Sequence, residues 1–86
     1  MSYFIRTYRK GVPKIIEIPT LKKARATAFK YVRDSTVVYI YKSQYGKAWA
    51  GFVQYYGFGK YLWEDEKGKV WFVHDDGSLT KAVRRF

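Results

Sequence analysis

Glycine-centred turn signals recur through the second half of this chain and constrain its fold more than any other feature. Between them lie short stretches rich in β-branched and aromatic residues, which is the usual composition of strands. The signals are Gln44-Tyr45-Gly46, Tyr56-Gly57-Phe58-Gly59, Lys67-Gly68 and Asp76-Gly77. Their spacing predicts a meander of about five strands, over residues 36–43, 47–56, 60–66, 69–75 and 79–86.

The first half of the chain predicts a hairpin followed by a helix. Residues 2–9 and 12–18 read as strands joined at Lys10-Gly11, and Pro13 places the second strand at a sheet edge or gives it an irregular start. Thr20 is a suitable N-cap for a helix running from residue 21 to about residue 34. The predicted fold is therefore α+β, a single domain over residues 1–86. It is an antiparallel sheet of about seven strands, open or barrel-like, in the order β-β-α-β-β-β-β-β, with one amphipathic helix packed on it.

The predicted helix has one apolar side and one cationic side. At 100° per residue, the apolar stripe consists of Leu21, Ala24, Ala28, Tyr31 and Val32, with Phe29 at its margin. The opposite side carries Lys22, Lys23, Lys30 and Arg33. We expect the first side to pack on the sheet and the second to face solvent.

Both faces of the C-terminal strands are predicted to be apolar. Two-residue turns at Lys67-Gly68 and Asp76-Gly77 would place on one face Tyr61, Trp63, Val70, Phe72, His74, Leu79 and Val83. The other face would then hold Leu62, Trp71, Val73, Thr80 and Ala82. One short helix covers only part of one face, so either the sheet coils into a barrel or an aromatic face stays exposed as a binding platform.

Charge favours an anionic partner. The chain has 17 Lys and Arg against 7 Asp and Glu, and nine of the basic residues with only one acidic residue lie in the first 33 positions. Ten aromatic residues and three lysines lie within residues 39–63, and aromatic rings beside cations are typical of surfaces that bind single-stranded nucleic acid. The predicted phosphate contacts are Arg6, Arg9, Lys10, Lys14, Lys22, Lys23, Lys30 and Arg33. The predicted base-stacking residues are Trp49, Tyr55 and Phe58.

No catalytic or metal-binding signature stands out. His74 is the one histidine, cysteine is absent, and the acids at 64–66 and 75–76 are expected at opposite ends of a hairpin. We therefore expect neither an enzyme nor a bound cofactor. The lack of cysteine and of a long apolar run indicates a cytoplasmic protein that is neither exported nor integral to a membrane.

The functional prediction is a small non-catalytic nucleic-acid-binding module that contacts mainly phosphate. The alternative is a protein-interaction or regulatory module, of phage or bacterial type, that binds an acidic partner through aromatic and arginine anchors. Glycan binding on the tryptophans is a third reading. These three classes differ in their expected salt dependence, which is steep for polyanions.

Overall fold

One helix and seven strands make up the described part of the computed structural model, which covers residues 2–9, 11–32, 37–46 and 48–82. The elements are β1 (Tyr3–Arg9), β2 (Val12–Ile18), α1 (Leu21–Tyr31), β3 (Val37–Tyr41), β4 (Trp49–Gly57), β5 (Lys60–Asp65), β6 (Val70–Val73) and β7 (Leu79–Lys81). All neighbouring strands are antiparallel, in the spatial order β2-β1-β3-β4-β5-β6-β7. The predicted fold class and element order are confirmed.

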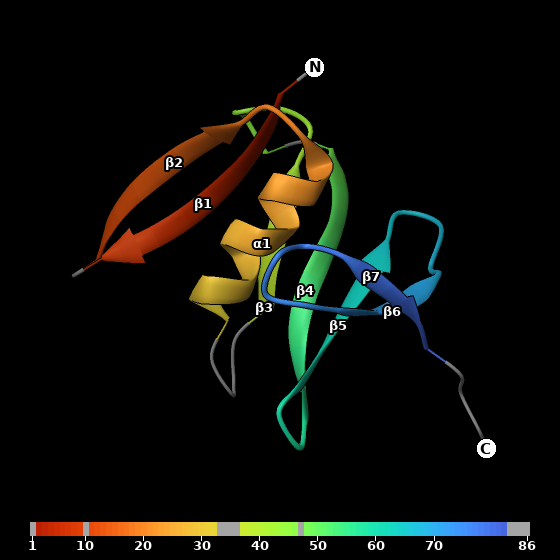
Figure 1. The fold of residues 1–86 in the computed structure, drawn as a ribbon. Helices are drawn as coiled ribbons and strands as arrows, with labels where there is room; N and C mark the ends of the chain where they lie inside the picture. The colour runs from red at the N-terminus through yellow and green to blue at the C-terminus, as the bar shows by residue number, and fades with distance from the viewer. Residues whose placement is uncertain (1, 10, 33–36, 47, 83–86) are drawn as a thin grey trace.

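The sheet is open rather than closed into a barrel. Its edges are β2 and β7, and α1 crosses one face (Figure 1). Pro13 lies in the edge strand β2, where a missing backbone donor costs the sheet no ladder hydrogen bond, as the sequence predicted. Since α1 is the one helix among the described residues, no described helix covers the opposite face of the sheet.

Small residues allow α1 to lie close to the sheet. Ala24 and Ala28 lie on the side of α1 that faces the sheet, and both are fully buried. Thr20 caps the helix as predicted, since its hydroxyl oxygen accepts a hydrogen bond from the Lys23 amide at 3.2 Å. Tyr31 was predicted to lie on the buried stripe, but it is 44% exposed; the helix ends there, and Val32 adopts an extended conformation and is buried instead.

The core lies between α1 and the sheet. Its strand residues alternate with residues of the opposite face, as a two-residue side-chain period requires. The buried members are Ile5, Ile18, Ala24, Ala28, Val32, Val38, Ile40, Ala50, Val53, Trp63 and Val73. Phe29, at the margin of the helix, packs on Tyr61 with ring centres 4.1 Å apart.

Relative to β5, the predicted face assignment is wrong for β6 and right for Leu79 and Thr80 of β7. Trp63 pairs with Trp71 and Val73 pairs with Leu79, so these residues share the face that α1 covers. Both connecting loops have three residues rather than two, 66–68 and 75–77, and each ends on a glycine in the left-handed conformation. A three-residue loop with a left-handed glycine is a common hairpin connection, and its extra residue exchanges the two faces of the strand that follows. The first loop therefore exchanges the faces of β6, and the second restores Leu79 and Thr80 to their predicted faces.

A β-bulge in β4 decides which way Trp49 points. Ile40 pairs with Gly51 whereas the next residue, Tyr41, pairs with Trp49, so Ala50 is the extra residue of β4. Ala50 is buried in the core. Trp49 consequently lies beside Tyr41 on the opposite face, where strict alternation would have turned it toward α1.

The β6–β7 loop folds back onto the first turns of α1. Gly77 lies against the backbone of Lys22 and Ala26, and its carbonyl oxygen accepts a hydrogen bond from Nε of Arg25 at 2.9 Å. Figure 1 shows this loop wrapping in front of the helix. The strongly curled sheet thus holds α1 from the β1–β3 side and from the β6–β7 side.

Candidate ligand-binding face

The sheet face opposite α1, here called the open face, carries three strand aromatic residues that are more than one-third exposed: Tyr39, Trp49 and Tyr56. Its residues follow from the strand register: Phe4 pairs with Tyr41, Tyr39 with Phe52, and Tyr41 with Trp49. On the α1 face, the corresponding positions of β3 are the buried aliphatic residues Val38 and Ile40. The five-residue strand β3 therefore separates an aliphatic core side from an aromatic solvent side.

Four rings on this face form one cluster, called here the aromatic cluster: Tyr39, Tyr41, Trp49 and Phe52. Tyr39 is at its centre, with ring centres 6.2 Å from Tyr41, 5.7 Å from Trp49 and 5.2 Å from Phe52. Trp49 and Phe52 are 6.0 Å apart. Tyr39 and Trp49 keep 39% and 37% of their surface exposed, so the cluster is both mutually packed and open to a ligand.

Arg6 lies at the edge of the aromatic cluster. Its guanidinium carbon is 5.4 Å from the centre of the Tyr41 ring, within the range of a cation–π contact. The same guanidinium lies against Gly46, close enough that a Cβ there would meet its terminal nitrogens. Tyr45, in that turn, is 74% exposed. A cation and an exposed ring are thereby held at the β3–β4 end of the open face.

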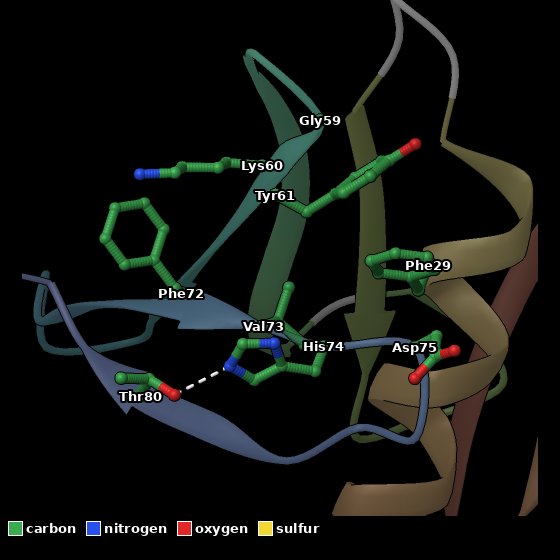
Figure 2. A pocket seen from close by; sticks show the side chains of 9 residues that line it. All are labelled: Phe29, Gly59, Lys60, Tyr61, Phe72, Val73, His74, Asp75 and Thr80. Atoms are coloured by element: carbon green, nitrogen blue, oxygen red, sulfur yellow. Dashed lines mark hydrogen bonds between the residues drawn. The ribbon is translucent and has the colours of Figure 1, made fainter.

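A second group of rings lies farther across the open face. Tyr56 and Phe72 have ring centres 6.1 Å apart, and Nζ of Lys60 lies 5.2 Å from the Phe72 ring centre. Next to them is a pocket of about 410 Å³ (Figure 2), within the size range of small-ligand sites. Figure 2 shows Lys60 and Phe72 on one side of it and Tyr61 with Phe29 on the other.

His74 lies at the base of this pocket. Its Nε2 is 2.6 Å from the Thr80 hydroxyl oxygen, and this is the one side-chain hydrogen bond of His74 to another described residue. A histidine that activates a hydroxyl usually has its other ring nitrogen held by a third group. No group of three or more potential metal ligands occurs among the described residues. The pocket thus offers aromatic rings, the His74 imidazole, the Lys60 ammonium and the Asp75 carboxylate, which suit binding of a flat polar ligand.

Two acidic residues reduce the net positive charge of the open face. Glu17 pairs with Phe4, and Glu64 pairs with Phe52, so each lies on this face beside an aromatic residue. The two negative charges of these acids offset the two positive charges of Arg6 and Lys60 on the same face. The rings, rather than an excess of local charge, are therefore the distinctive property of the open face.

The structure divides the predicted binding residues between two sides. Arg6 and Trp49 lie on the open face, and Phe58 is 96% exposed at the β4–β5 turn with a φ of 56°. Lys14 pairs with Thr7 on the α1 side, where Lys22, Lys23 and Lys30 are exposed on the helix. Lys10, Arg33 and the side chain of Arg9 lie outside the described part of the structure.

Tyr55 also lies on the α1 side. It pairs with Tyr61, packs on that ring with centres 5.2 Å apart, and accepts a hydrogen bond from the Gly59 amide at 3.2 Å. Tyr39, Tyr41 and Phe52 were not singled out as site residues. The alternation of aliphatic and aromatic residues from Val38 to Tyr41 is the signal that could have identified the first two.

Comparisons of the chain with protein-family models, with curated proteins and with solved structures gave no match. Within the described residues, α1 is the one helix, and it lacks the length and apolarity needed to cross a membrane. The geometry of the open face is therefore the basis for assigning a function.

Proposed function

We propose that this protein is a non-catalytic module that binds single-stranded nucleic acid on its open face. The observation that carries the proposal is the aromatic cluster, with two of its rings more than one-third exposed and Arg6 at its edge. Bases stack on such rings with a gain of about 1–3 kcal/mol each. A duplex hides the flat faces of its bases, so this surface favours an unpaired strand.

Cations contribute to this binding in two ways. Arg6 and Lys60 lie beside rings of the open face and are placed to contact the phosphates that link stacked bases. The lysines of α1 lie on the opposite side and act through the long-range field of a chain with net charge +10. Two or three phosphate contacts predict a log–log salt slope of roughly −1.5 to −2 for a single strand.

Fluorescence anisotropy with a labelled oligonucleotide tests the proposal through two matched double variants. Tyr39→Leu/Trp49→Leu keeps apolar bulk while removing two rings, and we expect it to weaken binding at least tenfold at every salt concentration. Lys22→Glu/Lys30→Glu changes only the helix side, and we expect a loss that fades as salt is raised. Thermal melting confirms that each variant is folded.

The opposite result for the two variants would place the nucleic-acid-binding site on α1. If the lysine variant abolished binding at moderate salt while the ring variant bound as the wild type does, phosphate contacts on α1 would be the main interaction. Absence of binding to any oligonucleotide at low salt would reject nucleic acid as the ligand.

The second candidate function is binding of a protein partner on the same face. Ile15 and Val37 extend the aromatic cluster with aliphatic surface, being 48% and 42% exposed on the open face. Aromatic and aliphatic residues around an arginine are the usual composition of an interface core. This alternative predicts no oligonucleotide binding, and its interface would depend only weakly on salt.

A further inference from the structure

A second pocket lies on the α1 side of the sheet, apart from the open face. Its volume is about 420 Å³, which is within the range of small-ligand sites. The aromatic part of its wall comes from Tyr3, Trp63 and Trp71, and Arg25 enters it from the helix. Cations from the β3–β4 and β5–β6 ends of the sheet, Lys42, Lys67 and Lys69, also line it.

Arg25 is held in this pocket without an acidic partner. Its guanidinium carbon lies 5.6 Å from the Trp63 ring centre, and its Nε donates to the Gly77 carbonyl oxygen. Among the described residues, no carboxylate forms an ion pair with it. Partial burial lowers the pKa of Arg25 from its ordinary value, and the Tyr3 phenol acts in the opposite direction. A partly desolvated guanidinium keeps its charge and gains from an incoming anion.

The two acids of the pocket are already engaged. The Glu66 carboxylate forms an ion pair with Lys42 at 2.6 Å. The Asp65 carboxylate accepts hydrogen bonds from the backbone amides of Lys67 and Lys69, both at 2.9 Å. Because those bonds use backbone nitrogens, the ammonium groups of Lys67 and Lys69 remain available to a ligand. The pocket therefore presents three cations to an anion, beside indole rings.

We infer that this pocket binds a small molecule in which a flat ring carries an anionic group, such as an aromatic carboxylate or a nucleoside monophosphate. Arg25 receives the anionic group, and Lys67 and Lys69 contribute from the wall of the same pocket. The ring packs mainly against Trp71, because Trp63 is only 2% exposed and Arg25 lies over its ring. An anion without a ring would contact only the cations, and a ring without an anion would contact only the aromatic wall. We therefore expect a ligand with both groups to bind more tightly than a ligand with either one. This inference does not depend on the function proposed for the open face.

Tryptophan fluorescence provides the test, because Trp63 and Trp71 line the pocket and Trp49 does not. The Trp49→Leu protein removes the signal of the open face and serves as the parent. We expect saturable quenching with adenosine monophosphate or with benzoate, and at least tenfold weaker binding of adenosine and of inorganic phosphate. Binding of only one of the two anions identifies the anionic group, phosphate or carboxylate. Calorimetry on the same protein gives an independent affinity.

Two variants connect the binding to the pocket cations. Arg25→Gln is expected to weaken it at least tenfold, and Lys67→Gln/Lys69→Gln by about threefold to tenfold. The lysine pair provides the decisive result if the arginine variant fails to fold, since no hydrogen bond to another described residue uses those side chains. Lys23→Gln, on the exposed surface of α1, is the matched control and should bind as the parent does.

Three results would overturn the inference. They are absence of saturable binding to both anions at millimolar concentration, equal binding of adenosine and its monophosphate, and unchanged affinity after loss of Lys67 and Lys69. None of these results bears on oligonucleotide binding at the open face, which the Tyr39 and Trp49 variants measure separately.

Discussion

At the scale of single residues, the carboxylate of Asp76 stabilises the β6–β7 loop. One of its oxygens, Oδ1, accepts hydrogen bonds from the Ser78 hydroxyl at 2.6 Å and from the Ser78 amide at 2.9 Å. These bonds, with a smaller effect from the charge of Lys22, lower the pKa of Asp76 below its ordinary value of 3.8. The ionised form is therefore the one that the fold prefers.

A carboxylate with a lowered pKa stabilises the folded state at neutral pH and loses that effect as the pH falls through its folded-state pKa. We expect Asp76→Ala to melt below the wild type at pH 7. The gap should shrink as the pH falls from about 4, the ordinary pKa of an aspartate, through the lower folded-state pKa of Asp76, where the carboxylate becomes protonated in the folded wild type. Asp75→Ala, in the same loop, should show a small gap throughout. A gap for Asp76→Ala that does not change with pH would contradict this account.

Trp49 and Tyr55 show at the same scale what a sequence pattern can specify. Both belong to β4, and the sequence predicted both as base-stacking residues. The bulge at Ala50 turns Trp49 onto the open face, whereas Tyr55 pairs with Tyr61 on the covered face. A bulge depends on how two strands fit together, so it cannot be derived from one strand alone. Tyr45 and Phe58 lie in turns that the glycines predicted, and both are exposed.

At the scale of secondary-structure elements, the β6–β7 loop packs against α1 at Gly77. Gly77 has a φ of +85°, and a Cβ there would overlap the Lys22 carbonyl oxygen and come within 3.1 Å of the Ala26 amide nitrogen. Gly68 has nearly the same φ, +82°, but a Cβ there would meet no atom within 4 Å. The two glycines thus share a left-handed backbone conformation and differ in the approach of the helix.

Comparing Gly68→Ala with Gly77→Ala measures how much the packing of the β6–β7 loop on α1 contributes to the free energy of unfolding. Gly68→Ala should cost about 1–2 kcal/mol, the penalty of a left-handed alanine. Gly77→Ala should cost about 1–3 kcal/mol more, because the added methyl group overlaps the helix backbone. Urea denaturation of both variants gives the two values. Equal losses would mean that the loop does not press on α1 in solution.

The three-residue loops explain why the elements could be predicted while their register could not. Turn glycines and strand composition were enough to give the order and approximate ends of the strands, and the Thr20 cap gave the start of α1. The end predicted for the last strand, residue 86, lies outside the described residues. Predicting Lys67-Gly68 and Asp76-Gly77 as two-residue turns shifted the register by one at each turn. Because side chains alternate at every residue, the first shift exchanged Phe72 with Trp71 between the two faces, and the second cancelled it at β7.

At the scale of the whole molecule, one helix and an open sheet give the protein two different surfaces. The helix side carries Lys14 and the lysines of α1, and the open face carries the aromatic cluster. Composition alone suggested one basic and aromatic site. The topology separates them, because the lysines of α1 lie over one face of the sheet and the aromatic cluster lies on the other.

Mapping the contact surface of a short single-stranded oligonucleotide by NMR is the most direct test of the central claim. The proposal predicts that the shifted amide and side-chain signals belong to Arg6, Tyr39, Trp49 and Phe52, while those of Lys22, Lys23 and Lys30 change little at moderate salt. It also predicts smaller shifts with a duplex of equal length. Shifts concentrated on α1, with the aromatic cluster unchanged, would contradict the assignment of the open face as the binding surface.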